Sequence, residues 1–275
     1  MIYQLDRVSK HYPTREGGLV RSLEDLSLGV GAGEQIALIG KSGAGKTTLF
    51  RLLNATLRPT RGTILFDNRD TATLGGRELR AVRRRIGTVY QQHHLVPSLT
   101  VLENALCGKL GQWSLLQTLR NTVHPGKLET EEALHALELV GLAERRRARA
   151  DELSGGQQQR LAIARMLMQD PDVILADEPV ASLDPALSEQ ITALLVRLAE
   201  TEGRRRTLVV ALHTVELALA HFPRIVALRN GRVSFDAPPR EVGRDALSEL
   251  YAGEEAATER GRDAEPLKLR TNCTL

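Results

Sequence analysis

Runs of consecutive apolar residues, separated by stretches with helical spacing, form the main pattern along this chain. The run Gln35–Ile39 precedes a glycine-rich loop, and apolar residues then recur at helical spacing over residues 47–55. Further apolar runs occupy Ile86–Val89, Val173–Ala176, Leu208–Leu212 and Ile225–Leu228. Uninterrupted apolar runs are typical of strands buried on both faces, so their alternation with helices predicts an α/β fold with a parallel core sheet.

Two regions depart from this pattern. Residues 3–30 alternate between apolar and polar positions around proline and glycine turns, which predicts two or three antiparallel strands. Between Glu103 and Leu153 the strand signal disappears and apolar residues recur at helical spacing. We therefore expect an N-terminal antiparallel β subdomain and a helical subdomain at about residues 95–168.

The C-terminal part contains a hairpin signal and then loses its apolar periodicity. Asn230-Gly231 lies between two apolar runs and predicts a hairpin that joins the strands Ile225–Leu228 and Val233–Phe235. The sequence thus predicts one domain over residues 1–251, followed by a flexible tail at 252–275.

Composition removes several classes of function. The chain has 275 residues, of which 42% are hydrophobic and 26% charged, as in an average globular domain. A net charge of +3 and an aromatic content of 3% argue against a nucleic-acid partner, so the arginine clusters at 83–85, 145–149 and 204–206 are predicted to be solvated faces. No signal peptide and no long apolar stretch is visible, so neither secretion nor a membrane span is expected.

The two cysteines do not indicate a disulfide framework or a zinc site. Cys107 and Cys273 lie far apart in the sequence, and the second belongs to the predicted tail. A reducing compartment is the simplest interpretation.

A phosphate-binding loop is the first motif that carries chemistry. Residues 40–47 match G-x-x-x-x-G-K-[ST] between a predicted strand and a predicted helix, a context that a chance glycine-rich turn would lack. Glycines let backbone N–H groups turn towards phosphates, Lys46 neutralises their charge, and the Thr47 hydroxyl can ligate Mg²⁺. The predicted ATP-binding residues of this segment are Gly40, Lys41, Ser42, Gly43, Ala44, Gly45, Lys46, Thr47 and Thr48.

Two carboxylates follow the apolar run Val173–Ala176. Because ligands bind beyond the carboxyl ends of parallel strands, Asp177 and Glu178 are candidates for catalysis. Asp177 can hold Mg²⁺ through its water shell, and Glu178 can orient or deprotonate an attacking water. An isolated acidic pair is more often a solvated strand end, but a phosphate loop in the same chain favours the functional interpretation.

The segment Leu153, Ser154, Gly155, Gly156 and Gln157 narrows the class of ATPase. It is followed by QQRLAIARML, ILADEP and ASLD, and in this order and spacing the chain resembles the ATP-binding subunits of ABC transporters over about residues 2–251. The segment itself is a second glycine-rich turn that opens a helix, with Ser154 as the N-cap and the positive dipole end available to an anion. The resemblance implies a P-loop NTPase fold of the ABC type, in which this turn contacts the γ-phosphate bound to the other subunit of a head-to-tail homodimer.

The resemblance also implies roles for single positions. Tyr12 lies where an aromatic residue stacks on adenine, although packing in a strand is the alternative, and Gln91 looks like the glutamine that senses Mg²⁺ and the lytic water, with Gln92 as the neighbouring candidate. His213 resembles the histidine that contacts the γ-phosphate, beside the catalytic Glu178. Metal binding would fall to Thr47, Gln91 and Asp177, and the loop at the dimer interface to Ser182, Leu183 and Asp184.

A closer resemblance is to the ATP-binding subunits of phosphonate importers. It rests on VPSLTVLENALCGKLGQWSLLQTL, with an insertion around Trp113, on the segments that follow, and on Val180, where many ABC subunits have threonine. It implies a peripheral ATPase at the cytoplasmic face of the inner membrane, which uses ATP and Mg²⁺ and works with two transmembrane permease subunits and, indirectly, a periplasmic substrate-binding protein. The cargo could also be phosphite or another phosphorus oxyanion. Two other functions are alternatives: the ATPase of an exporter or of lipoprotein release, and a soluble regulatory ABC protein.

Overall fold

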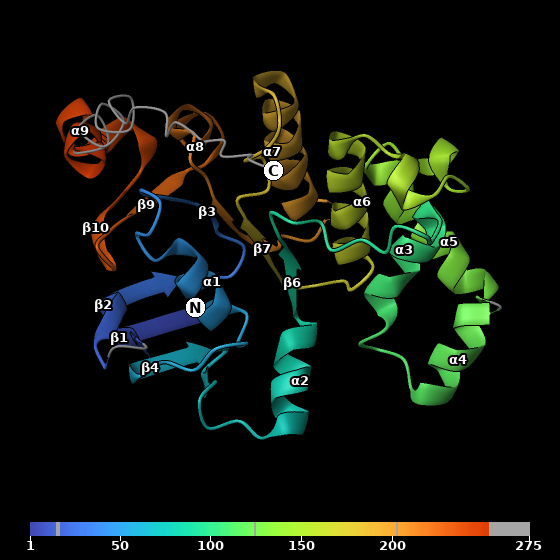
Figure 1. Ribbon diagram of the computed structural model, residues 1–275, viewed down its shortest axis with the longest axis horizontal. Coiled ribbons are helices and arrows are strands. Elements are labelled where there is room, and N and C mark those ends of the chain that lie inside the picture. The colour runs from blue at the N-terminus through green and yellow to red at the C-terminus, as the bar shows by residue number, and fades with distance from the viewer. Residues whose placement is uncertain (15–16, 124, 202, 253–275) are drawn as a thin grey trace, which may run out of the picture.

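A mixed sheet in which most neighbouring strands are parallel forms the centre of the molecule (Figure 1). The computed structural model describes residues 1–14, 17–123, 125–201 and 203–252. Within them the sheet has six strands in the order β10-β9-β3-β8-β7-β6, and only the pairing of β10 with β9 is antiparallel. These strands are β3 (Gln35–Ile39), β6 (Ile86–Val89), β7 (Val173–Asp177), β8 (Thr207–Ala211), β9 (Arg224–Arg229) and β10 (Arg232–Ala237).

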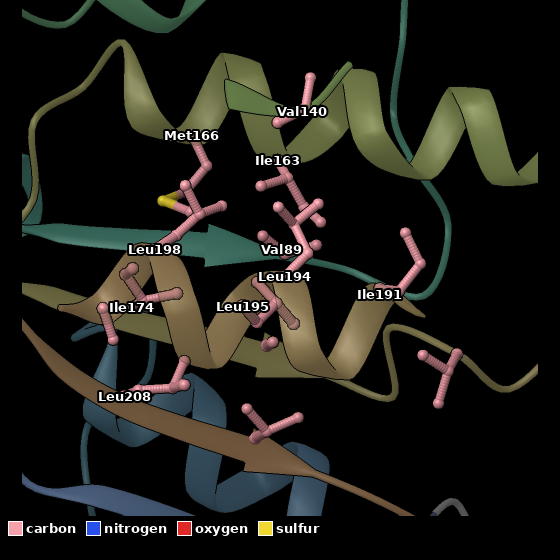
Figure 2. Close-up of a cluster of buried hydrophobic side chains, with 14 of the residues drawn as sticks. Val89, Val140, Ile163, Met166, Ile174, Ile191, Leu194, Leu195, Leu198 and Leu208 are labelled. Carbon is pink, nitrogen blue, oxygen red and sulfur yellow. The ribbon is translucent and has the colours of Figure 1, made fainter. Parts of the chain in front are cut away.

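Side chains of the parallel strands alternate between two hydrophobic layers, as their continuous apolar sequence predicts. In β7, for example, Ile174 belongs to one hydrophobic layer, which is covered by helices. Val173 and Leu175 belong to the other layer, which also contains residues of the second sheet described below. Figure 2 shows part of the first layer, where Ile163 points towards Val89 and Met166 towards Leu198. The helices that cover the core are α1 (Lys46–Leu53), α2 (Gly76–Arg84), α7 (Pro185–Ala199), α8 (Val215–His221) and α9 (Arg244–Tyr251).

The second sheet is antiparallel and lies at the N-terminal side of the molecule (Figure 1). Its order is β2-β1-β4-β5, from β1 (Tyr3–Pro13), β2 (Leu19–Val30), β4 (Arg61–Phe66) and β5 (Arg69–Asp70). The prediction of antiparallel strands over residues 3–30 is confirmed with two strands. Strand β4, which pairs with β1, was not predicted from the apolar pattern, although the turn residues Asp67 and Asn68 that follow it, both at positive φ, are a typical hairpin signal.

Helices fill the segment after β6, as their spacing predicts. They are α3 (Val101–Leu106), α4 (Leu115–Val123), α5 (Lys127–Leu139) and α6 (Gly155–Leu167), and short 3-10 turns link them at Cys107–Lys109, Ala143–Arg145 and Ala150–Glu152. This group stands beside the sheet, away from the antiparallel strands (Figure 1). The subdomain limits at 95 and 168 and the domain limit at 251 stay predictions.

The expected hairpin at Asn230-Gly231 is present between β9 and β10. Arg229 pairs directly with Arg232, and Asn230 and Gly231 have φ values of 51° and 75°, the signs that a type I′ turn requires. A last 3-10 turn, Pro239–Glu241, leads to α9. Of the tail predicted at 252–275, residues 253–275 lie outside the described residues. In the described part of the chain, no helix has the length and apolar character needed to cross a membrane.

Candidate active site

The predicted catalytic residues gather at the carboxyl edge of the parallel sheet. Gly40 follows β3, Asp177 ends β7, and His213 lies just after β8. The register places these ends side by side, because Ala211 of β8 pairs with Leu38 on one side and with Asp177 on the other. Gln91 follows β6, whose Val89 pairs with Ala176. One edge therefore collects residues from four distant segments, as expected for the ligand-binding edge of an open α/β sheet.

The phosphate loop is held by close backbone approaches that exclude side chains. A Cβ on Gly40 would lie 2.4 Å from the carbonyl oxygen of Leu228, and a Cβ on Gly45 would lie 2.6 Å from the carbonyl oxygen of Ser22. Both glycines also have positive φ, at 150° and 104°. The hairpin turn adds a hydrogen bond from the Gly231 N–H to the carbonyl of Ala44, at 3.1 Å. Neighbouring strands thus fix the shape of the loop, and its glycines are required by space as well as by conformation.

Lys46 connects the loop to the catalytic carboxylate. Its ammonium donates to the carbonyls of Gly40 at 2.6 Å and Lys41 at 3.2 Å, and it lies 3.6 Å from a carboxylate oxygen of Glu178. The residue is 4% exposed, so its charge is concentrated in a site with little solvent. A phosphate that entered the loop would find this cation already in place.

Glu178 is the residue around which the other charged groups meet. Its Oε1 lies 2.6 Å from Nε2 of His213, which is on the neighbouring strand end. Its φ is 53°, a left-handed conformation that is unfavourable for glutamate. Such conformations persist where the surrounding structure enforces them, and they concentrate at functional sites. The geometry gives a carboxylate and an imidazole that can share a proton.

Asp177 has the properties of a cation ligand. The carboxyl is 9% exposed, and burial, followed by the negative charge of Glu178, raises its pKa, although a hydrogen bond from Thr47 and the charge of Lys46 act against this. Its Oδ1 is buried without a hydrogen-bond partner in the described part of the chain. A buried oxygen of this kind beside a threonine hydroxyl fits a hard divalent cation, whose remaining ligands would be water and phosphate oxygens. The donor set therefore agrees with the predicted Mg²⁺ site.

The predicted signature turn lies at the start of a different helix. Ser154 caps α6: its hydroxyl accepts from the N–H of Gln157 at 3.4 Å, and the Gln157 side chain accepts from the Ser154 N–H at 3.0 Å. A Cβ on Gly156 would lie 2.4 Å from Leu187 of α7, whereas a Cβ on Gly155 would meet open space. Gly156 thus serves the packing of two helices, and Gly155 leaves its backbone accessible.

The predicted interface loop is adjacent to this turn. Asp184 caps α7, and its carboxylate accepts from the N–H of Leu187 at 3.0 Å, the residue that also contacts Gly156. Ser182 is exposed, and Leu183 packs partly on the hydrophobic core. The structure therefore brings the signature turn and the interface loop together. No hydrogen bond or ion pair recorded for the described residues joins either of them to Lys46, Asp177 or Glu178.

Tyr12 and Gln91 lie at the borders of the site. Tyr12 pairs with Val20 across β1 and β2, is half-buried, and belongs to neither hydrophobic cluster of the described residues, which speaks against simple packing. Gln91 is exposed and lies two residues after the end of β6. Its neighbour Gln92 instead lines a groove that reaches Gln158 of α6, so Gln91 stays the better candidate for the catalytic edge.

Comparison with known proteins agrees with this arrangement. The family model described as ABC transporter matches residues 23–181. The chain belongs to the ABC transporter family. A phosphonates import ATP-binding protein of Pseudomonas fluorescens is 46% identical over 236 residues, which are 86% of this chain and 88% of that protein. A protein of the same description from Anaeromyxobacter dehalogenans is 46% identical over 90% of this chain, but the chain spans about half of it, 49%.

A solved structure supports the fold of this ABC family member. It is a dimeric ATP-binding cassette bound to ADP and phosphate in a post-hydrolysis state. It is 34% identical, has a TM-score of 0.73, and covers 87% of this chain and all, 100%, of the other. The ABC ATPase fold that the sequence resemblance implies is thereby confirmed, and membership of the family implies nucleotide binding.

Several features of this ABC cassette were not visible in its sequence. They include the left-handed φ of Glu178 and its contacts with His213 and Lys46, which come from other segments. Ser22, which donates a hydrogen bond to Thr48 at 2.7 Å, was not a candidate, because nothing in the residues around it distinguishes it from other strand serines. Its contact with the phosphate-binding helix becomes visible only when its place in the sheet is known.

Proposed function

We propose that the chain is the ATP-hydrolysing subunit of an ABC importer that takes up phosphonates or related phosphorus oxyanions such as phosphite. The observation that carries this proposal is the 46% identity over nearly the full length of both chains to a phosphonates import ATP-binding protein. The constellation of Lys46, Asp177, Glu178 and His213 at one sheet edge supports ATP hydrolysis as the activity.

ATP would bind along the phosphate loop, with its base at Tyr12. Backbone N–H groups of residues 40–48 and the Lys46 ammonium would receive the phosphates, and the positive N-terminal end of α1 adds to their attraction. Lys10 Nζ lies 5.4 Å from the centre of the Tyr12 ring on one side, so the base would stack on the other. Mg²⁺ would be held by Thr47, Gln91 and, through water, Asp177, and when bound it neutralises the charge that develops on the phosphates.

Hydrolysis would rest on Glu178 and His213. Glu178 would orient the attacking water and accept its proton, and the hydrogen-bonded imidazole of His213 would hold the carboxylate in place and contact the γ-phosphate. The 3.6 Å separation of Glu178 and Lys46 supports this, since it places the carboxylate beside the cation that would receive the phosphates. The proton leaves the water as its oxygen attacks the γ-phosphorus, and ADP and phosphate are the products.

The active unit would be a homodimer. The signature turn Leu153–Gln157 begins α6, whose side chains pack on the face of the sheet opposite to that covered by α1. With Ser154 and Gly155 exposed, the turn is accessible to the nucleotide of a second copy. Ser182 and Asp184 would lie at the same interface, and closure around two ATP molecules would drive two permease subunits. A substrate-binding protein would act on those permeases, at the other side of the inner membrane.

The test is growth of a deletion strain on phosphonate, phosphite or phosphate as the sole phosphorus source. Complementation would use the wild type, Glu178→Gln and the control Glu249→Gln, which alters a carboxylate that is 72% exposed and pairs with Arg229. We expect loss of growth on phosphonate or phosphite, restored by the wild type and the control only. Equal growth of the deletion strain on all three, in the absence of a second importer, would contradict the cargo. Co-purification with an exporter-type membrane protein would contradict the direction.

A further inference from the structure

Strand β2 contains a bulge directly beside the phosphate loop. Lys10 of β1 pairs with Leu23, but the next residue, His11, pairs with Arg21. Ser22 therefore has no partner on β1, and its ladder position is skipped. Bulges bend a strand and redirect a side chain, and they are frequent next to active sites.

The bulge makes two contacts with the nucleotide-binding loop. The Ser22 hydroxyl donates to Oγ1 of Thr48 at 2.7 Å. The Ser22 carbonyl oxygen lies so close to Gly45 and Gly231 that a Cβ on either would come within 2.6 Å and 2.7 Å of it. The same strand donates from the Glu24 N–H to the carbonyl of Gly231 at 3.0 Å. The carbonyl of Ser22 thus closely approaches the phosphate loop at Gly45, while its side chain contacts α1.

The hydroxyls of Ser22 and Thr48 form a hydrogen bond with each other at the start of α1. Either hydroxyl of this pair can donate, but a phosphate oxygen can only accept, so a Thr48 hydroxyl that donates to a phosphate must accept from Ser22. Within residues 1–14, 17–123, 125–201 and 203–252, Ser22 is the hydrogen-bond partner of Thr48 Oγ1, which leaves the hydroxyl able to donate to a ligand. A hydroxyl that accepts one hydrogen bond becomes a stronger donor in the next. Thr48 stands in the first turn of α1, where backbone N–H groups and the helix dipole also favour an anion.

We propose that Ser22 is a positioning residue for nucleotide binding: from the bulge it orients the Thr48 hydroxyl as a donor to a phosphate oxygen of the bound nucleotide. The inference rests on the proposed function and adds to it a residue that touches no substrate. The hydroxyl of Ser22 matters only through Thr48. Its effect is therefore expected on nucleotide affinity, while the Glu178–His213 pair keeps its contacts.

The test measures the dissociation constant of a fluorescent ATP analogue, together with the KM and kcat of ATP hydrolysis. Loss of one hydrogen bond corresponds to roughly a five-fold change. We expect Ser22→Ala to raise Kd and KM by about that factor with little change in kcat, and Ser22→Thr, which keeps the hydroxyl, to restore most of the affinity. Ser27→Ala is the matched control, since Ser27 is on the same strand and its hydroxyl accepts from the Arg7 N–H, at 3.0 Å, away from the phosphate loop.

A double-mutant cycle separates positioning from general destabilisation. Thr48→Val should weaken binding, and Ser22→Ala in that background should add less than two-fold. The role of Ser22 would be overturned if Ser22→Ala left Kd unchanged, or if it raised Kd equally in the wild type and in Thr48→Val. Either result would leave the proposed function intact. Failure of the wild type to bind ATP would overturn both.

Discussion

The two edges of the parallel sheet differ in how their charged side chains are paired. At the amino edge three arginines and three aspartates form a continuous ladder of ion pairs: Asp67–Arg85 at 2.8 Å, Arg85–Asp172 at 2.6 Å, Asp172–Arg204 at 2.5 Å, Arg204–Asp170 at 2.6 Å and Asp170–Arg206 at 3.2 Å. At the carboxyl edge Glu178 pairs with both Lys46 and His213, whereas the adjacent Asp177 has Oδ1 buried without a hydrogen-bond partner among the described residues. The first edge balances its charges, and the second does not.

The difference is visible in the pKa values of the two aspartates at the ends of β7, Asp172 just before it and Asp177 at its last position. Burial works against ionisation of Asp172, but hydrogen bonds and charge from Arg85 and Arg204 outweigh it and hold the pKa below its usual value. Burial and the neighbouring Glu178 raise the pKa of Asp177. The charge of Asp172 is thus compensated by arginines of the same chain. The pKa of Asp177 is perturbed in the direction that is common at functional sites.

The largest effect should come from the carboxyl edge. Glu178→Gln removes the proton acceptor but keeps the size of the side chain, so ATP hydrolysis should fall by about 100-fold or more while ATP binding persists. Steady-state hydrolysis and size-exclusion chromatography with ATP check this, and an ATP-stabilised dimer is expected. Normal turnover, or a variant that stays monomeric with ATP, would remove Glu178 from its role.

Breaking the ladder at the amino edge should reduce stability and leave nucleotide binding unchanged. Asp172→Asn removes a carboxylate that accepts from two arginines, Arg85 and Arg204. Because the group is partly exposed, we expect the free energy of unfolding to fall by about 1–2 kcal/mol. Urea denaturation measures it, and Asp25→Asn, an exposed carboxylate 4.0 Å from Arg232, is the control. Loss of ATP affinity without loss of stability would show that the two edges are not distinct.

The same substitution at the other edge should act in the opposite direction. Asp177→Asn removes a carboxylate that burial and Glu178 disfavour, so nucleotide-free protein should gain up to about 1 kcal/mol of stability while hydrolysis is lost. Urea denaturation without nucleotide or Mg²⁺ measures the gain. A clear loss of stability would mean that Asp177 is compensated after all.

The smallest effect is the pH dependence of the stability changes caused by Asp172→Asn and Asp177→Asn. The contribution of Asp172, whose folded pKa is lowered, is fully present above the unfolded value of about 3.9 and is lost as the pH falls through the folded pKa. For Asp177 the folded pKa is raised, so the penalty that Asp177→Asn relieves should shrink as the pH falls through that value towards about 3.9. Urea titrations from pH 7 to pH 4 should thus show the gain from Asp177→Asn fading first. Parallel curves would contradict the opposite shifts.

Much of the architecture followed from local pattern. The apolar runs predicted the strands β3, β6, β7, β8 and β9, and the Asn-Gly pair predicted the turn to β10, because burial on two faces and a type I′ turn leave clear local signatures. Strand β4 was missed, since its six residues include an exposed Arg61 and Gly62 and it acquires its place by pairing with β1. Pairing across distant segments has no local signature.

The chemical groups of the site can be read from the residues alone: the phosphate loop with Lys46, the carboxylates Asp177 and Glu178, and a signature turn capped by Ser154. Their conformation and contacts depend on how distant segments pack. The left-handed φ of Glu178, the unpaired oxygen of Asp177 and the bulge that turns Ser22 towards Thr48 each arise where strands distant in sequence meet. Local sequence sets the conformational preference of a segment, but strain, burial and register are properties of its neighbours.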